Sequence, residues 1–225
     1  MKKLVLIAIL ACFSATSQAS LIFFGEDLSP NTSTVNSDSA NADFLASLIA
    51  AGTEDFESFS AGQNGPLAVD FGTAGIATLS GSGEIRSSAS AGRFATSGTN
   101  YWNTREDFTI EFSQAISAFG FYGTDIGDFA GQITLEFLSG ATSNVTVDNT
   151  VNAPNAALLF WGIIDNANPF TKITFGNTNS SDVFGFDDMT IAVASQIVTN
   201  PVPEPSTLAI LALGLFGLRA RQLKK

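Results

Sequence analysis

The chain has 225 residues and a formal net charge of −11, with one cysteine and no histidine. The missing histidine excludes a Ser-His-Asp triad, and one cysteine excludes an intrachain disulfide and the usual cysteine–histidine zinc sites. Residues 20–200 carry four basic residues against twenty acidic ones, a net charge of −16. We therefore expect no nucleic acid or anionic lipid as partner of this part, and we expect cations to be attracted to it.

Residues 1–19 have the composition of a secretory signal peptide. Two lysines near the start precede an apolar run, and a small-x-small cleavage site ends at Ala19. Ser20 is then the first residue of the exported protein. A lipoprotein signal that ends at Cys12 is the alternative, and either cleavage leaves no histidine and no disulfide in the exported chain.

Residues 20–53 are expected to form an N-terminal segment with a short strand at 21–24 and one short helix. The segment 28–40 is rich in Ser, Asn and Thr and is predicted to be a surface loop. Apolar residues recur with helical spacing within 42–51. Asn41 is available as N-cap and Gly52 follows the predicted end of the helix.

Residues 54–195 are predicted to form a β-sandwich domain. Twenty phenylalanines, together with many Thr, Ser and Gly residues, favour strands. Apolar and polar residues alternate within 107–113 and 132–138, which is typical of strands with one buried face. The predicted strands are 55–60, 67–71, 76–80, 84–87, 107–113, 116–122, 132–138, 144–147, 157–164, 171–176 and 184–193.

The number and spacing of these strands predict an all-β fold, an antiparallel jelly-roll-like β-sandwich. A single barrel is the alternative architecture. We find no internal repeat of fixed period, which argues against a solenoid or a propeller.

The C-terminal part combines three features. Residues 196–206 form a proline-rich linker that contains Pro203, Glu204 and Pro205, and residues 207–225 combine an apolar run with a basic tail. This order is typical of a membrane helix with its basic end in the cytoplasm. The apolar run of about 13 residues corresponds to roughly 20 Å of helix, against a hydrocarbon core of about 30 Å. A transient transmembrane-type helix that is later cleaved fits this length better than a permanent anchor; a tail that packs on the domain is the alternative.

The proline–glutamate–proline triplet, the apolar run and the basic tail together resemble the PEP-CTERM sorting signal. This resemblance implies that an exosortase-type membrane enzyme processes the protein after export. It also implies at least a transient stay at the inner membrane, and then a place at the cell surface or in the extracellular matrix, with exopolysaccharide as a candidate partner.

Glu57 near the first core strand, and Asp187 and Asp188 in the last one, resemble the strand edges of carbohydrate-binding modules and MAM-type jelly rolls. In those folds such carboxylates hold a structural calcium ion, so the resemblance implies Ca²⁺ here. Asp187 alternates with Met189 and is expected to point into the core, where a carboxylate needs a counter-charge. Solvated carboxylates, or pairing with one of the arginines, are the alternatives. An Asp125–Asp128 pair is interpreted as a polar turn, with metal binding as the alternative.

Tyr101 and Trp102 lie among Asn and Thr residues, and this stretch is predicted to be a loop in which both aromatic rings contact a glycan. Trp161 lies within an apolar run and is assigned to the core. No motif marks a pair of carboxylates for glycoside hydrolysis.

Three functional hypotheses follow. The first is an exported, non-enzymatic β-sandwich protein, sorted to the cell envelope or the extracellular polysaccharide matrix as a structural or adhesive component. The second is a calcium-stabilised glycan-binding module. The third is a carboxylate-based polysaccharide hydrolase.

Overall fold

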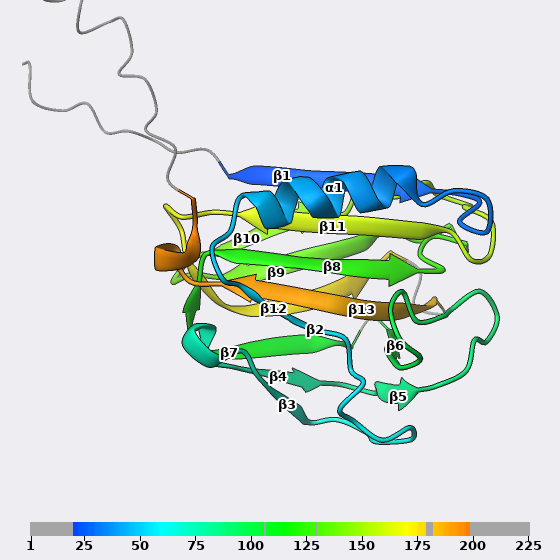
Figure 1. The fold of residues 1–225 in the computed structure, drawn as a ribbon, viewed down its shortest axis with the longest axis horizontal. Helices are drawn as coiled ribbons and strands as arrows, with labels where there is room; N and C mark the ends of the chain where they lie inside the picture. Colours follow the sequence, from blue (N-terminus) through cyan, green and yellow to red (C-terminus); the bar gives the residue numbers. More distant parts are fainter. Residues whose placement is uncertain (1–19, 106, 129, 179–181, 199–225) are drawn as a thin grey trace, which may run out of the picture.

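The computed structural model describes residues 20–198 except 106, 129 and 179–181. The predicted signal peptide and the predicted sorting segment lie outside the described residues. Within them the chain forms thirteen strands, one α-helix and two short 3₁₀ helices, 72–74 and 194–196 (Figure 1). The elements are β1 (Leu21–Asp27), α1 (Val35–Ala46), β2 (Gly52–Glu54), β3 (Leu67–Asp70), β4 (Ile76–Ser80), β5 (Glu84–Arg86), β6 (Tyr101–Arg105), β7 (Thr109–Ile116), β8 (Ala118–Thr124), β9 (Ile133–Leu138), β10 (Thr142–Thr146), β11 (Leu158–Ile164), β12 (Phe170–Asn177) and β13 (Val183–Ala192).

The strands form two antiparallel sheets. The first has the order β1-β11-β8-β13-β6-β5, and β2 pairs with β13 beside β6. The second has the order β10-β9-β12-β7-β4-β3. The predicted all-β antiparallel sandwich with one short N-terminal helix is therefore confirmed. The strand predicted at 21–24 is confirmed as part of β1, and it belongs to the first sheet.

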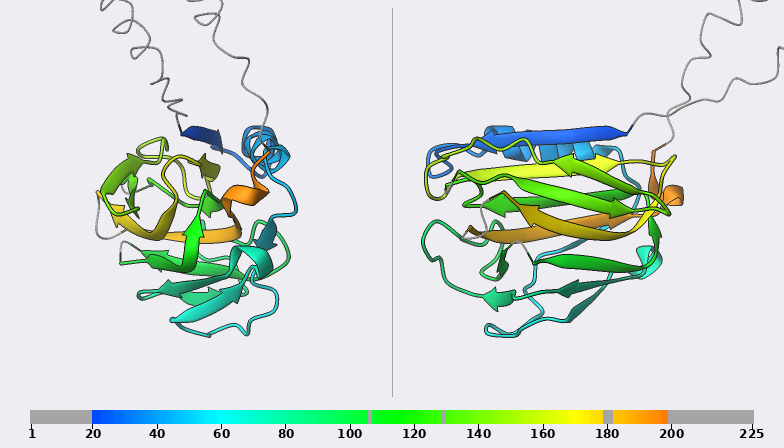
Figure 2. Two further views of the ribbon diagram at one scale, coloured as in Figure 1. Left: turned by 90° about the vertical axis from the view of Figure 1, so that its left-hand side faces the viewer. Right: turned by 180° about the vertical axis from the view of Figure 1, so that it is seen from behind.

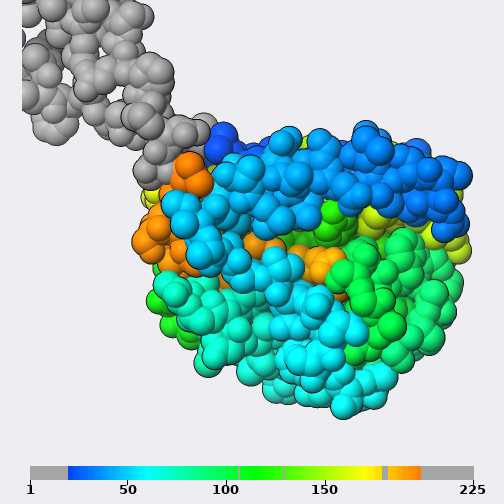
Figure 3. Space-filling view, in the orientation of Figure 1, coloured from blue at the N-terminus to red at the C-terminus, as the bar shows by residue number. Residues whose placement is uncertain are grey.

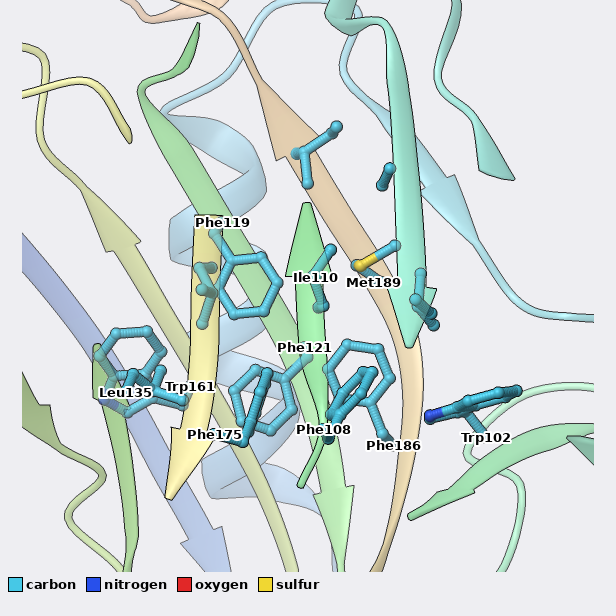
Figure 4. Packing of buried hydrophobic residues seen from close by; sticks show 14 of the residues in the cluster. Trp102, Phe108, Ile110, Phe119, Phe121, Leu135, Trp161, Phe175, Phe186 and Met189 are labelled. Atoms are coloured by element: carbon cyan, nitrogen blue, oxygen red, sulfur yellow. The ribbon is translucent and has the colours of Figure 1, made fainter. Parts of the chain in front are cut away.

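The core lies between the two sheets and is rich in phenylalanine (Figure 4). The rings of Phe121 and Phe186 stack with centroids 5.0 Å apart, and those of Phe108 and Phe175 stack at 4.6 Å. On β7 the buried Ile110 alternates with solvent-facing neighbours, as the sequence predicts for a strand with one buried face. Burial of these rings supplies most of the driving force for folding.

Strands β8 and β11 are buried along their whole length, because α1 covers the outer face of the first sheet (Figures 1 and 2). The ring of Phe44 on α1 contacts Phe160 of β11 and Phe23 of β1, with centroids 5.6 and 5.5 Å away. The continuous apolar sequence of β11 reflects this two-sided burial.

The helix was expected within 42–51, and it lies at Val35–Ala46 instead. Its start is fixed from another element, because the Asp27 carboxylate accepts hydrogen bonds from the backbone N–H groups of Asn36 (3.3 Å) and Ser37 (2.9 Å). These are free donors of the first helical turn. The second half of the predicted 28–40 loop is therefore helical.

The predicted strand 55–60 is also wrong. Phe56 has a φ of +58°, in the left-handed region, so the chain turns immediately after β2. Of residues 52–60, only Gly52–Glu54 pairs with β13. None of the helices in the described part of the chain is long and apolar enough to cross a membrane. The expected membrane helix at 207–225 is not among these residues.

Candidate binding cavity

A cavity of about 360 Å³ opens between α1, the outer face of the first sheet and the segment 94–97. Figure 3 shows the surface recessed below α1, where part of β13 (orange) is visible between the helix and the neighbouring chain segments. Five elements (α1, β2, β8, β11 and β13) and two loop segments contribute polar and apolar groups to its wall. The lining residues are Thr34, Asp38, Asn41, Leu45, Thr53, Phe94, Thr96, Tyr122, Leu158 and Asp188.

The helix side of the cavity carries Asp38. One of its carboxylate oxygens accepts a hydrogen bond from the hydroxyl of Tyr122 (2.9 Å), and the other accepts one from the hydroxyl of Thr34 (2.6 Å). Burial raises the pKa of Tyr122, and the hydrogen bond to Asp38 raises it further. Tyr122 therefore stays a neutral donor that holds the Asp38 carboxylate in position.

The sheet side of the cavity carries two adjacent carboxylates. Asp187 is 1% exposed; it accepts a hydrogen bond from the backbone N–H of Thr96 (2.7 Å), and the hydroxyl oxygen of Thr96 lies 3.0 Å from the same carboxyl oxygen. Asp188 is half-buried and accepts hydrogen bonds from the hydroxyls of Thr96 and Ser97, both at 2.7 Å. Burial, and then the negative charge of Asp188, raise the pKa of Asp187 to about 8.

A β-bulge brings these two carboxylates together. The register between β13 and β8 shifts after Asp187, and Asp188 has a φ of +46°. Phe186 and Met189 both point into the core between the sheets, three residues apart. Asp187 was expected to share the inward face with Met189. The extra residue of the bulge instead places it on the outer face, where the segment 94–97 covers it.

Glu57, the third expected calcium ligand, binds the chain just beyond the segment 94–97. Its carboxylate accepts hydrogen bonds from the backbone N–H groups of Thr99 (2.7 Å) and Asn100 (2.5 Å), which lower its pKa. Among the described residues, no group of three or more Asp, Glu, His or Cys side chains is arranged to hold a metal ion. The structure therefore brings Asp187 and Asp188 together, and leaves Glu57 apart from them.

The predicted aromatic platform is not at the surface. The stretch that contains Tyr101 and Trp102 is strand β6, and both side chains are fully buried. The Tyr101 hydroxyl donates to the Ser88 carbonyl at 3.2 Å, and the Trp102 ring packs against Phe108 in the core. The expectation that these two rings contact a glycan is therefore wrong, because neither presents a face to solvent.

Asp125 lies at the end of β8 in the left-handed region and pairs with Arg93 at 3.3 Å. Burial raises its pKa, and the charge of Arg93 opposes this shift. The turn predicted at this position is confirmed.

A second cavity of about 390 Å³, which shares Phe94 with the first, is lined by Arg93 and by small residues and contains no carboxylate.

Sequence reasoning missed Asp38, Phe94 and Tyr122 as site residues. Asp38 lies in a polar stretch that was predicted to be a loop, and Tyr122 belongs to a strand that looked like core. The pairing of a tyrosine with a carboxylate 84 residues away depends on how α1 docks on the sheet. Only tertiary structure shows that arrangement.

Solved structures similar to this chain include an adhesin domain and carbohydrate-binding modules. The K2 cleaved adhesin domain of Lys-gingipain is 14% identical, with 64% of this chain and 100% of that chain covered and a TM-score of 0.43. The C-terminal family 22 carbohydrate binding module of Clostridium thermocellum Xyn10B is 16% identical, with 66% and 95% covered and a TM-score of 0.39. The CBM22-1 xylan-binding domain from Paenibacillus barcinonensis Xyn10C is 11% identical, with 68% and 98% covered and a TM-score of 0.39.

No curated protein matches the chain. One family model does match, and it is described as the PEP-CTERM protein-sorting motif. It aligns with the segment that contains the proline–glutamate–proline triplet, the apolar run and the basic tail. The chain carries a PEP-CTERM protein-sorting motif at residues 201–225, and this motif implies export and processing at a membrane.

Proposed function

We propose that this protein is an exported, non-enzymatic β-sandwich that is sorted to the cell envelope or the extracellular polysaccharide matrix, where it is a structural or adhesive component. The observation that carries the proposal is the sorting motif at residues 201–225, which follows the folded sandwich in the same chain. The composition of residues 20–198 supports a non-enzymatic role, because they contain no histidine and no cysteine.

The sorting part of this proposal is tested in the native host with a Glu204→Ala variant. Loss of the only charged side chain of the triplet is expected to leave the protein unprocessed at the inner membrane. Ser206→Ala, immediately after the triplet, is the matched control and is expected to be processed normally. Cell fractionation and mass spectrometry of the C-terminus measure both outcomes. Normal release of the Glu204→Ala variant would contradict recognition of the triplet.

The cavity beside α1 favours a second candidate, a calcium-stabilised glycan-binding module. Hydroxyl, amide and carboxylate groups line it together with the rings of Phe94 and Tyr122. Its volume lies near the lower end of the range for small-molecule sites, roughly 300–1,000 Å³, and accommodates one sugar unit. This candidate includes a structural calcium ion beside Asp187 and Asp188. A divalent cation there would neutralise the negative charge of these two adjacent carboxyl groups.

A glycan array with and without calcium tests the second candidate, with an Asp188→Asn variant as the site probe and Glu111→Gln as the control. Glu111 pairs with Lys172 on the second sheet and is distant from the cavity in the fold. Glycan binding that Asp188→Asn abolishes and Glu111→Gln preserves supports the module. If the protein hydrolyses polysaccharide and Asp38→Asn abolishes this activity, the carboxylate-based hydrolase would replace the glycan-binding module as the second candidate.

A further inference from the structure

The negative charge of the cavity beside α1 is not balanced by a basic side chain of the described residues. Two of its lining residues, Asp38 and Asp188, are acidic, and none of the lining residues in the described part of the chain is basic. Arg86 pairs with Glu84, Arg93 with Asp125 and Lys172 with Glu111. Arg105 lies on β6, a strand that contributes no residue to the cavity. Within residues 20–198, as far as the structure describes them, the cavity carboxylates therefore have hydrogen-bond donors and no counter-cation.

Both carboxylates are held in fixed positions and keep acceptor capacity. A carboxylate offers about four acceptor positions. Asp38 accepts one hydrogen bond at each oxygen, from Tyr122 and Thr34. Asp188 also accepts one at each oxygen, from Thr96 and Ser97. Asp38 is exposed and Asp188 is half-buried, so a ligand in the cavity reaches their remaining lone pairs.

Apolar groups line the same space. The rings of Phe94 and Tyr122 and the side chains of Leu45 and Leu158 form part of the wall. A hydrated metal ion would make no favourable contact with these apolar side chains. A protonated amine on a carbon ring does use them, because its C–H groups pack on the aromatic rings and its positive charge is attracted to their faces.

We propose that this cavity binds a hexosamine unit with a free, protonated amino group. The ammonium group donates hydrogen bonds to Asp38 and Asp188, whose charge it balances. The ring carbons pack on Phe94 and Tyr122, and the sugar hydroxyls are bonded by Asn41 and the threonine hydroxyls of the wall. This inference rests on the second candidate function, glycan binding, and names its ligand class: amino sugars of a polysaccharide, in preference to neutral or N-acetylated sugars.

The proposal is tested by isothermal titration calorimetry of the purified exported chain, with and without calcium, against a matched set of probes. The probes are a β-1,4-linked glucosamine oligomer, the same oligomer in N-acetylated form, the corresponding glucose oligomer and 1,5-diaminopentane. The free-amine oligomer is expected to bind at least about tenfold more tightly than the other two oligomers, since the contrast is one charged hydrogen-bonded group. Binding is also expected to weaken with added salt.

Asp38→Asn keeps the acceptor for Tyr122 and removes the charge. It is expected to lower the affinity for the amine oligomer by about tenfold. Asp43→Asn, an exposed position on the same helix that does not line the cavity, is the matched control and is expected to change nothing. Asp188→Asn provides a second measurement from the opposite wall if Asp38→Asn alters the melting temperature.

The outcomes separate the two levels of the proposal. Equal affinity for the three oligomers would overturn the amine preference and leave glycan binding in place. Binding of diaminopentane as tight as that of the amine oligomer would overturn the sugar assignment. An absence of binding by every oligomer would overturn the glycan-binding candidate itself. Amine-selective binding that Asp43→Asn weakens as much as Asp38→Asn does would place the site elsewhere and overturn the assignment.

Discussion

The buried carboxyl group of Asp187 accepts a hydrogen bond from the backbone N–H of Thr96 at 2.7 Å and lies 3.0 Å from the hydroxyl oxygen of the same residue. Thr96 belongs to a segment without regular structure that forms one wall of the candidate cavity. This relationship joins the last strand of the fold to that segment. The protonation state of Asp187 therefore bears on the stability of the fold and on the shape of the cavity.

We predict that the protein loses stability as pH rises from about 5 to about 8. The pKa of Asp187 is raised from its ordinary value of 3.8 to about 8, by burial and by the charge of Asp188. The folded chain thus binds a proton that the unfolded chain has released, and the stability this proton contributes is complete below the unfolded pKa and lost as pH rises through the folded one. One such group changes the free energy of unfolding by at most about 1.4 kcal/mol per pH unit.

The measurement is the melting temperature against pH in a buffer with chelator, for the wild type and for Asp187→Asn. The variant is expected to give a flatter profile in this window. The slope is the relevant quantity, because the substitution also changes the absolute stability. The chain has no histidine to produce a slope of its own there. Glu111→Gln, at an exposed ion pair, serves as control and should keep the wild-type slope. Parallel profiles for wild type and Asp187→Asn would show that Asp187 titrates normally.

A second prediction concerns calcium. If a divalent cation binds beside Asp187 and Asp188, it relieves their repulsion and raises the melting temperature, whereas a chelator lowers it. Saturation at about a hundred times the dissociation constant corresponds to about 2.7 kcal/mol. Differential scanning calorimetry with calcium and with chelator measures the shift. Asp188→Asn should reduce the shift, and Asp70→Asn, at the exposed end of β3, should not. An identical melting temperature in both buffers, with no heat of calcium binding, would show that the protein does not bind calcium.

A third prediction follows from the burial of Trp102. Its ring lies against Phe108 and close to Gly83, and the side chain has no exposed surface. Trp102→Ala is expected to lower the free energy of unfolding by about 3–5 kcal/mol. Chemical denaturation measures this loss. Trp102→Phe, which keeps an aromatic ring in the core, should lower the free energy of unfolding by less than Trp102→Ala does. Any glycan affinity of the folded fraction should be unchanged. A stable Trp102→Ala variant that loses glycan binding would instead restore the exposed platform predicted from the sequence.

The sequence was sufficient for the sandwich and for the alternation of β7 and β9, because side chains alternate along a strand whatever it pairs with. It also placed Asp187 and Asp188 within the last strand, where the structure has them. It failed where one residue changes the register. The bulge at Asp188 reverses the face on which Asp187 lies, and no local pattern marks that extra residue.

The helix and the cavity were missed for a related reason. The start of α1 is fixed by Asp27, a residue on another element, and burial raises the pKa of Asp27 less than the hydrogen bonds from Ser37 and Asn36 lower it. The net lowering shows that the ionised carboxylate is stabilised at the helix N-terminus. The apolar periodicity within 42–51 reflects only the C-terminal part of the helix. A site that is built between α1 and the sheet could not be predicted from the sequence once the helix was misplaced.

The docking of α1 depends on two glycines, which leads to the last prediction. Gly120 of β8 and Gly162 of β11 face each other across the strand pair, and the ring of Phe44 lies over both. A Cβ at Gly120 would lie 2.7 Å from the Phe44 ring, and one at Gly162 would lie 2.9 Å from it. Because Phe44 is fully buried, an alanine at either position has to push α1 away from the sheet.

Gly120→Ala and Gly162→Ala are each expected to lower the free energy of unfolding by about 1–3 kcal/mol, the usual range for overpacking. They should also weaken ligand binding in the cavity, because Asp38, Asn41 and Leu45 move with the helix. Gly176→Ala on β12 is the matched control, since a Cβ there meets nothing closer than 3.7 Å. Chemical denaturation and calorimetric titration are run on all three variants. If the two glycines under Phe44 tolerate alanine as well as Gly176 does, then α1 is not fixed by this contact, and the cavity cannot owe its shape to it.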